Sequence, residues 1–283
     1  MIPATSAPSY LKVTIAVPLY RSAPFLSIVT ETLQSQDYPN LEFLISDRHL
    51  DDDTIERLQD TFSPDPRFRF LIARDQLDWV AHYNLLLTVA SGSYFVWMSH
   101  DDSYSSDFVR KLVEALERNP DAILAYARVE RITMSGERLT KITPKIPDPS
   151  WRPGPVNAYR IALSGGLQFH GVFRRKWLLD RKLWIRPTIH NIAADMLWLF
   201  ALATIGRTLY VENCTYWKRY HERNTYKTWS SIMRPRYVWS FARVVRSYLA
   251  DYVPSLFQRV LAICISYLAC ALWSVRLTLR RNR

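Results

Sequence analysis

Glycine and cysteine are scarce in this chain of 283 residues, which holds 7 glycines and 3 cysteines. No Gly-x-Gly-x-x-Gly follows the first apolar run, and no Walker-type Gly-Lys-Ser/Thr occurs. These absences argue against a dinucleotide oxidoreductase and a P-loop enzyme, because both bind phosphate through glycine-rich loops. Cys214, Cys264 and Cys270 have neither metal-site spacing nor the density of a disulfide scaffold. We therefore expect a protein of a reducing compartment.

A secretory signal is also missing, because the N-terminus MIPATSAPSYLK has no basic start followed by an apolar stretch. We expect the catalytic part to stay in the cytoplasm.

Positive charge is concentrated in the second half of the chain. Residues 1–150 hold 15 Lys/Arg against 21 Asp/Glu, whereas residues 151–283 hold 22 against 5. A basic half can meet nucleic acid, anionic lipid or phosphorylated small molecules. Its basic residues are scattered among Trp and Tyr, with no recognition helix, zinc-finger spacing or RNA-binding signature. We therefore expect no nucleic-acid partner.

Apolar runs of strand length alternate with helix-period segments through the first half, a pattern typical of a mostly parallel sheet covered on both faces by helices. The expected strands are Val13–Val17, Leu41–Ser46, Phe68–Ile72, Tyr94–Met98 and Ile123–Val129, and the expected helices are Pro24–Ser35, Asp53–Phe62, Val80–Ala90 and Asp107–Arg118. Later segments predict a turn at 134–137, a proline-rich loop at 144–155, a strand at Phe169–Arg174, a helix at Met196–Ile205, a strand at Thr208–Trp217 and a helical tail from about Arg234. We divide the chain into an α/β catalytic domain, 1–230, and a basic and apolar tail, 231–283.

Polar residues follow the first four expected strands. Ligands of parallel sheets bind at the carboxyl ends of the strands, so these positions are candidates for a site: Pro18-Leu19-Tyr20, Asp47, Arg74-Asp75 and Ser99-His100-Asp101-Asp102. Adjacent carboxylates at the end of a buried strand are costly without a cation, and oxygen ligands favour Mg²⁺ or Mn²⁺. The alternative is that Asp101 or Asp102 caps the helix that begins near Asp107.

Five motifs carry a resemblance to a known family: the opening Val-Thr-Ile-Ala-Val-Pro-Leu-Tyr, Ile45–Thr54, Gly92–Asp102, Ala194-Asp195 and Arg219-Tyr-His221. Together they make residues 13 to about 225 resemble an inverting family 2 glycosyltransferase of GT-A fold. The resemblance implies metal-dependent transfer of a sugar, with inversion, from a nucleoside diphosphate donor, UDP-linked by expectation, to a hydroxyl of a glycan or lipid-linked acceptor.

The same resemblance assigns site residues. It implies a donor-binding set of Pro18, Tyr20, Asp47, Asn84, His100, Asp101 and Arg219, and a metal set of Asp101, Asp102 and His221. Ser99 stands where the family's Asp-x-Asp motif has its first acid, and Arg48-His49-Leu50 replaces small turn residues. His82 and Asn84 are two positions apart on one helix, so at most one of them is expected to face the nucleotide.

Asp195 matches the family's base, which removes the proton of the attacking hydroxyl. Because Asp is also a favoured helix N-cap residue, a capping role stays open. Gly165-Gly166, Gln168 and His170 are implied near the acceptor pocket, with turn formation before a strand as the alternative. His221 is implied as a metal ligand or as a hydrogen-bond donor to phosphate.

Residues 260–275 are uncharged and lie between Arg259 and Arg276. The stretch is shorter than the ~20 residues of a spanning helix, so three readings stay open: a membrane surface, packing within the protein or an oligomer, and spanning. The surrounding arginines favour an anionic membrane surface, with the enzyme peripheral on its inner face.

Two other functions compete with sugar transfer. The altered motifs fit a non-catalytic sugar-nucleotide or glycan-binding partner in a polysaccharide assembly complex. Nucleotidyl transfer also uses acidic metal ligands, but Pro18–Ser22 does not resemble the glycine-rich, basic loop that it needs.

Overall fold

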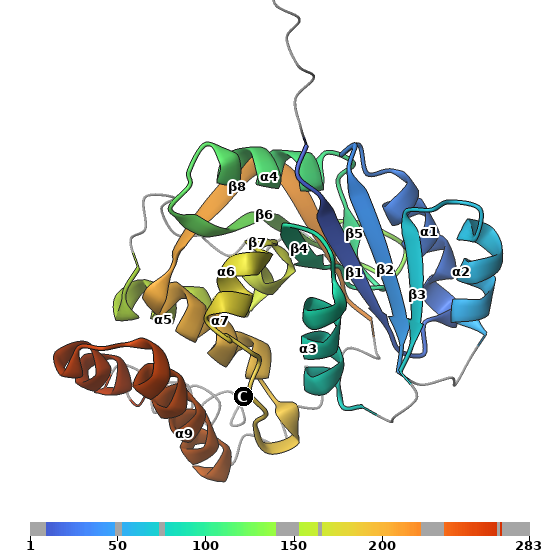
Figure 1. The fold of residues 1–283 in the computed structure, drawn as a ribbon. Helices are drawn as coiled ribbons and strands as arrows, with labels where there is room; N and C mark the ends of the chain where they lie inside the picture. The colour runs from blue at the N-terminus through green and yellow to red at the C-terminus, as the bar shows by residue number, and fades with distance from the viewer. Residues whose placement is uncertain are drawn as a thin grey trace, which may run out of the picture.

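A computed structural model describes residues 10–48, 53–73, 77–139, 153–163, 166–221, 235–264 and 267. In this part of the chain one sheet has the strand order β3-β2-β1-β4-β7-β6-β8-β5 (Figure 1). The strands are β1 Val13–Leu19, β2 Leu41–Asp47, β3 Phe68–Ile72, β4 Tyr94–Trp97, β5 Ser103–Tyr104, β6 Ala122–Ile132, β7 Val172–Arg174 and β8 Arg207–Arg219. The α-helices are α1 Leu26–Gln34, α2 Thr54–Phe62, α3 Trp79–Val89, α4 Phe108–Glu117, α5 Pro155–Leu163, α6 Arg175–Asp180, α7 Ala194–Ile205 and α9 Pro235–Tyr252, and the 3-10 helices are η1 Ala23–Phe25, η2 Leu167–His170 and η3 Ile189–Asn191.

The sheet is mostly parallel, as the sequence predicts. Strand β1 pairs in parallel with β2 and β4, β2 with β3, and β6 with β8. Strand β7 runs antiparallel between β4 and β6, and β5 runs antiparallel to β8. Parallel strands β1, β2 and β4 therefore end at the same edge, and the loop after β4 leads directly into β5 beside β8.

Two hydrophobic cores lie on opposite faces of the sheet. Alternation along β1 places Val13, Ile15 and Val17 in a core with α1, α2 and α4, and Ala16 in a core with α3, α5, α6, α7 and α9. Every residue of β1 and β2 is buried, as expected of strands that are covered on both faces.

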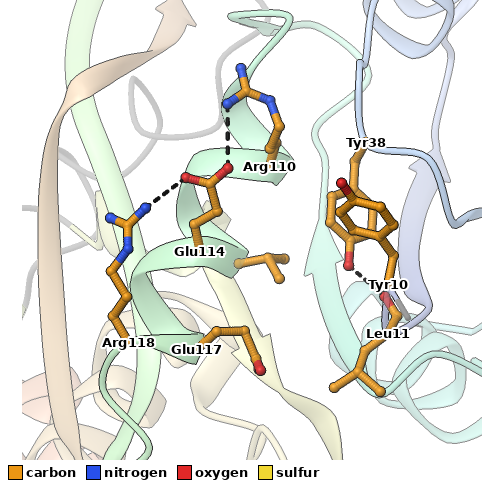
Figure 2. A pocket seen from close by; sticks show the side chains of 8 residues that line it. Tyr10, Leu11, Tyr38, Arg110, Glu114, Glu117 and Arg118 are labelled. Atoms are coloured by element: carbon orange, nitrogen blue, oxygen red, sulfur yellow. Dashed lines mark hydrogen bonds and ion pairs between the residues drawn. The ribbon is translucent and has the colours of Figure 1, made fainter. Parts of the chain in front are cut away.

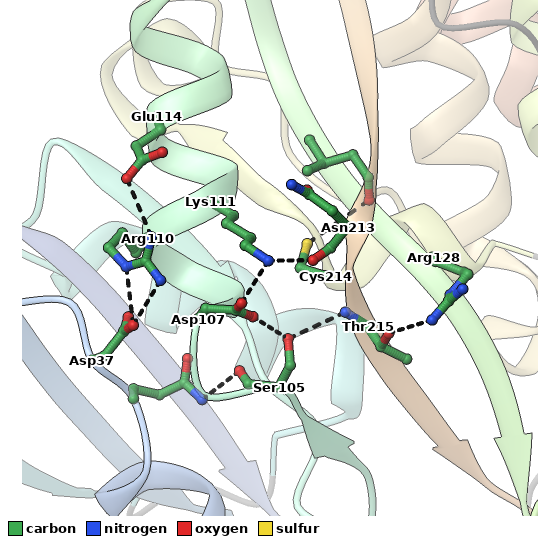
Figure 3. Close-up of polar contacts among 12 residues, drawn as sticks. Asp37, Ser105, Asp107, Arg110, Lys111, Glu114, Arg128, Asn213, Cys214 and Thr215 are labelled. Carbon is green, nitrogen blue, oxygen red and sulfur yellow. Dashed lines mark hydrogen bonds and ion pairs between the residues drawn. The ribbon is translucent and has the colours of Figure 1, made fainter.

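Polar contacts fix α4 against β8 (Figure 3). Lys111 Nζ lies 2.6 Å from Asp107 Oδ2 and also donates to the carbonyl oxygen of Asn213. The hydroxyl of Ser105 donates to Asp107 at 2.7 Å and accepts from the amide of Thr215 at 3.2 Å. These contacts anchor the strand whose last residues reach the crevice described below.

The expected strand Phe169–Arg174 is wrong in its first half. Gly166 has φ of 73° and starts the 3-10 helix η2, so the strand is confined to β7. Phe169 stacks on Trp97 with ring centroids 4.7 Å apart, and His170 Nδ1 donates to the Trp97 carbonyl at 3.1 Å. This packing onto β4 holds the segment in a tight turn, a tertiary effect that its apolar pattern does not reveal. Helix α6 follows without a predicted counterpart.

The tail begins with α9, which packs on α7 through Val245, Tyr248 and Leu249, members of the domain core. A further helical segment covers residues 256–264. The boundary between 230 and 231 stays a prediction. Within the described ranges, no helix combines the length and the apolar character needed to cross a membrane. Most of the uncharged stretch at 260–275, and most of the proline-rich loop at 144–155, lie outside the described residues.

Candidate active site

Contacts link residues at the carboxyl ends of β1, β2, β4 and β8, and we call this edge of the sheet the crevice. At the end of β1, the carbonyl oxygen of Pro18 accepts from His100 Nδ1 at 3.2 Å. The ring of Tyr20, 37% exposed, lies 4.4 Å from the Arg48 guanidinium that follows β2. Asp47 is buried at the last position of β2. The sequence-predicted donor residues of these two strands are therefore neighbours.

Asp101 and His221 form the polar centre of the crevice. His221 Nε2 lies 2.9 Å from Asp101 Oδ2, and the Ser99 hydroxyl donates to the other oxygen of that carboxylate. Burial alone would raise the pKa of Asp101, but the charge of Lys218 and the bond from His221 outweigh it and hold this pKa well below its usual range. Phe25 packs against the imidazole of His221, with ring centroids 5.1 Å apart. Asp101 is thus kept ionised and fixed in place.

The Asp102 carboxylate accepts hydrogen bonds from three groups of the protein. Its Oδ2 accepts from the Tyr216 hydroxyl at 2.5 Å and from Lys218 Nζ at 2.9 Å, and its Oδ1 accepts from the Arg219 amide at 2.7 Å. The carboxylate is fully buried, so these bonds use the directions that a metal ion would need. Helix α4 begins after Asp107, so neither Asp101 nor Asp102 caps it, and that alternative is wrong.

Arg219 is turned away from the carboxylates into a set of oxygen acceptors. Its guanidinium donates to the carbonyl oxygens of Asp101, Thr133 and Met134 and to the Ser103 hydroxyl, at 2.8 to 3.1 Å. The residue is 6% exposed. Its predicted contact with a leaving diphosphate stays a prediction, and the geometry favours a structural role.

Asp195 lies in the first turn of α7, one residue inside the helix. The N-cap residue is Ala193, in the left-handed region with φ of 56°, so the capping alternative for Asp195 is wrong. His190 and Asn191 also have positive φ, and such strain in non-glycine residues clusters at functional sites. The half-buried Asp195 carboxyl has its pKa raised from 3.8 to about 6, because burial disfavours the charged form.

Gly166 packs directly against Asp195. A Cβ atom at Gly166 would lie 3.1 Å from Asp195 Oδ2, and its φ of +73° is one that other residues rarely adopt. This contact joins the expected acceptor-side segment to the expected base.

Helix α3 contributes a residue that the sequence did not single out. His82 is buried against the Ser46 hydroxyl at 2.8 Å, and Asn84 exchanges two hydrogen bonds with the backbone of Ile185. Between them Tyr83 is acted on by the charges of Asp101, Lys218 and Asp195. Tyr83 stacks on Trp97 and Phe169 and lies near enough to these groups for their charges to act on its hydroxyl, and Asn84 has a structural contact. Asn84's role in donor binding stays a prediction.

The residues that fit a divalent cation are Asp101 and His221. Among the described residues, no group of three or more His, Cys, Asp or Glu side chains is placed to hold a metal. Mg²⁺ is usually bound by one or two carboxylates completed by substrate phosphates and water. The ionised Asp101 beside His221 fits that pattern, whereas the bonds to Asp102 do not leave room for it.

A separate cavity of about 220 Å³ lies at the opposite end of the sheet (Figure 2). Its lining includes Tyr10 and Tyr38, which precede β1 and β2, and Glu114, which accepts from Arg110 and Arg118 on α4. Tyr10 and Tyr38 lie at the amino ends of their strands, whereas the crevice is at the carboxyl ends, where parallel sheets bind ligands. The cavity is therefore separate from the crevice.

The fold resembles solved glycosyltransferases. Residues 1–349 of TarS from S. aureus in complex with UDP-GlcNAc align with a TM-score of 0.69 and 14% identity, covering 92% of this chain and 72% of that one. The mannosyltransferase PcManGT from Pyrobaculum calidifontis, in complex with GDP-Man and Mn²⁺, aligns with a TM-score of 0.56 and 16% identity, covering 96% and 85%. At such identities the likeness establishes the fold class.

The sequence comparison names the family. The sequence model described as Glycosyl transferase family 2 matches residues 14–184, more than half of the chain. The chain therefore belongs to glycosyl transferase family 2. An uncharacterized glycosyltransferase of Haemophilus influenzae is 26% identical over 125 residues, 44% of this chain and 38% of that protein. Protein y4gI of Sinorhizobium fredii is 27% identical over 128 residues, 44% of this chain and 14% of that protein. The chain thus spans well under half the length of these curated relatives.

Proposed function

We propose that this chain transfers a sugar from a nucleoside diphosphate donor to an acceptor hydroxyl, with inversion. The observation that carries the proposal is a pair of carboxylates with opposite surroundings at the crevice. Asp101 is held ionised by its cationic neighbours, whereas burial raises the pKa of Asp195 to about 6. Carboxylates whose pKa values are pushed apart in one site take different chemical roles.

Asp195 is the proposed base. With a pKa of about 6 it is ionised at neutral pH, yet it is a stronger base than an ordinary aspartate. It accepts the proton of the acceptor hydroxyl while that oxygen bonds to the anomeric carbon. The bond from this carbon to the donor diphosphate breaks, and its electron pair goes to the phosphate oxygen. Attack from the face opposite the diphosphate inverts the anomeric centre.

Asp101 and His221 would hold Mg²⁺ or Mn²⁺ beside the diphosphate, where a divalent cation neutralises negative charge as the sugar leaves. The Mn²⁺ of the mannosyltransferase complex supports this proposal. Phe25 and Ser99 keep the pair in position.

Asp47, Tyr20 and Arg48 are the proposed nucleoside contacts. They lie together at the ends of β1 and β2, and the stacked Tyr20 and Arg48 offer a flat surface to a base. The UDP and UDP-GlcNAc complexes of TarS support a UDP-linked donor.

A membrane-side acceptor is the remaining part of the proposal. Residues 256–264 form a helical segment that exposes Leu256 by 73%, Phe257 by 76% and Val260 by 51%. Phe257 and Val260 are three positions apart and Leu256 and Val260 are four apart, so Val260 shares a helix face with both. Arg243 and Arg246 are exposed on the preceding α9, and basic residues beside an apolar face attract anionic lipid headgroups. The enzyme would thus rest on the inner face of the membrane and act on a lipid-linked or glycan hydroxyl.

Replacement of the base tests the proposal. Asp195→Asn keeps the side-chain shape, so the dissociation constant of UDP should stay within about 2-fold, while transfer from a UDP-sugar in the presence of Mn²⁺ should slow by about 10²–10⁴-fold. Asp180→Asn, which changes an exposed carboxylate of α6, is the matched control. Unchanged turnover in Asp195→Asn would remove Asp195 from the role. Tight UDP binding without any turnover of a panel of UDP- and GDP-sugars by the native chain would favour a non-catalytic binding partner.

A further inference from the structure

Lys218 and Arg219 are consecutive on β8 and face different surroundings. Side chains alternate along a strand, and Lys218 shares its side with Tyr216: both donate to Asp102 Oδ2. Arg219 turns the other way, where its guanidinium is bonded to three carbonyl oxygens and a hydroxyl. Of these two cations, Lys218 is the one directed toward the carboxylates of the crevice.

The Lys218 ammonium has bonding capacity to spare. An ammonium group carries three N–H donors, and within the described part of the chain its one hydrogen-bonding partner is Asp102, at 2.9 Å. The Lys218 side chain is 22% exposed, while that of Asp102 is fully buried. The ion pair therefore holds the lysine at a buried carboxylate, while its side chain keeps some exposure and its ammonium keeps N–H donors beyond the one given to Asp102.

The negative charge of the carboxylates in the crevice favours a cation at the position of Lys218. Lys218 is paired with Asp102, and its positive charge also acts on Asp101 and Asp195. A diphosphate adds further negative charge to this group of carboxylates. Because like charges repel strongly in a partly buried site, a protein cation beside the diphosphate adds to the neutralisation that the proposed divalent ion would supply.

We propose that Lys218, rather than Arg219, contacts the β-phosphate of the donor, and that Asp102 is a positioning residue that holds Lys218 there. The inference rests on the proposed function. When the bond between the anomeric carbon and the β-phosphate oxygen breaks, the electron pair stays on that oxygen. Lys218 donates a hydrogen bond to it and keeps its own proton, while the proton of the acceptor hydroxyl goes to Asp195.

The test compares UDP with UMP, which lacks the β-phosphate, by calorimetric titration of the full chain with Mn²⁺ and again with EDTA. In Lys218→Met, UDP affinity should fall by about 10–100-fold, the effect of one charge-assisted hydrogen bond, and UMP affinity should stay within about 2-fold. Turnover of a UDP-sugar should fall by about 100-fold. Lys218→Arg should recover part of both losses. Lys176→Met, which changes an exposed side chain of α6, is the control and should change neither.

A second variant guards against misfolding, since Lys218→Met leaves Asp102 buried without its cation. Asp102→Asn combined with Lys218→Met removes both charges: the amide oxygen still accepts from the Arg219 amide, and the side-chain NH2 group can donate to the Tyr216 hydroxyl oxygen. It should show the same selective loss of UDP affinity. Equal losses for UDP and UMP, or no loss for either, in this folded double variant would overturn the inference while the proposed function stands. If the native chain binds neither UDP nor GDP, the proposed function falls and this inference falls with it.

Discussion

Asp195 is the proposed base, and its buried surroundings oppose its charge. Its folded-state pKa of about 6 lies above the ordinary 3.8, so between these values the folded chain holds a proton that the unfolded chain has lost. The stability contributed by this group is present below about pH 4 and is lost as pH rises through 6.

The raised pKa of Asp195 determines how the melting temperature and the rate should change with pH. Relative to the native chain, Asp195→Asn should gain about 2–6 °C in melting temperature on going from pH 4.5 to pH 7.5, because it lacks the buried charge. For the native enzyme, kcat/KM should rise about tenfold per pH unit below 6 and level off above it. Thermal melts and rate profiles at five pH values measure both. A native rate profile that is flat between pH 5 and pH 7 would contradict the role of Asp195.

We predict that Gly166 affects stability through its backbone conformation and activity through its contact with Asp195. Gly166→Ala should destabilise the fold by roughly 1–2 kcal/mol because of its positive φ, and should also lower kcat because its methyl group crowds the carboxylate. Gly136→Ala is the matched control: its φ is +88°, and nothing lies within 4 Å of a Cβ there. Equal kcat values in the two variants would show that the contact with Asp195 is unimportant.

At the scale of single elements, the sheet contains a buried acid that the chemistry does not use. Glu42, in β2, accepts from the Thr14 hydroxyl at 2.5 Å, the Ser91 amide at 2.9 Å and Arg69. Burial opposes its charge, but these bonds prevail and hold the pKa of Glu42 below its ordinary 4.5. Glu42 therefore joins β2 to the neighbouring strand β1 and to the turn before β4.

Glu42→Gln should lower the free energy of unfolding by about 1–3 kcal/mol at pH 7, because one charge-assisted bond is lost and the new amide brings a donor. A lowered pKa stabilises the folded state above pH 4.5, and this gain is lost as pH falls through the folded value. The difference from the native chain should therefore shrink toward pH 3. Urea unfolding at pH 7 and pH 4 measures it, with the exposed Glu114→Gln as control. A cost that grows on acidification would contradict this assignment.

The elements themselves could be predicted from the sequence wherever the pattern is local. The five strands of the first half and the position of Asp101 after β4 follow from apolar runs and their polar ends, and the structure has them. Asn84 shows the limit, because the amide that the family pattern assigned to the nucleotide is bonded to Ile185, 101 positions away. Helical spacing showed that His82 and Asn84 could not share a face. The contacts of Tyr83 between them, with Trp97, Phe169 and the charges near Asp101, depend on tertiary packing.

Lys218 and Arg219 are neighbours on one strand, and the alternation of side chains along a strand bears on which of them faces the crevice. The alternation of a strand already separates Lys218 from Arg219, so the sequence contained the information that the two cations face different ways. The partner of Lys218, Asp102, lies 116 residues earlier, and only the placement of β8 beside β5 brings them together. The contact between Lys218 and Asp102 could not be predicted, because it depends on the pairing of strands that lie far apart in the sequence.

At the scale of the whole molecule, the exposed apolar face of residues 256–264 should bind membranes. Replacing Leu256 and Phe257 by serine should weaken sedimentation with phosphatidylglycerol-containing vesicles at least 10-fold, because burying each side chain is worth about 1.5–3 kcal/mol. Val156→Ser, which changes a residue 51% exposed on α5, is the control. Phosphatidylcholine vesicles should bind less than anionic ones in every case. Equal vesicle binding by the native chain and the double variant would contradict a role for this face.

Calorimetric titration with UDP, and with GDP as comparison, each with and without Mn²⁺, measures whether the crevice binds a nucleoside diphosphate through Asp101. We expect UDP to bind more tightly in the presence of Mn²⁺, and we expect Asp101→Ala to abolish this binding or to weaken it by at least about 10-fold. Binding of neither nucleotide under any of these conditions, or UDP binding that Asp101→Ala leaves unchanged, would contradict this expectation.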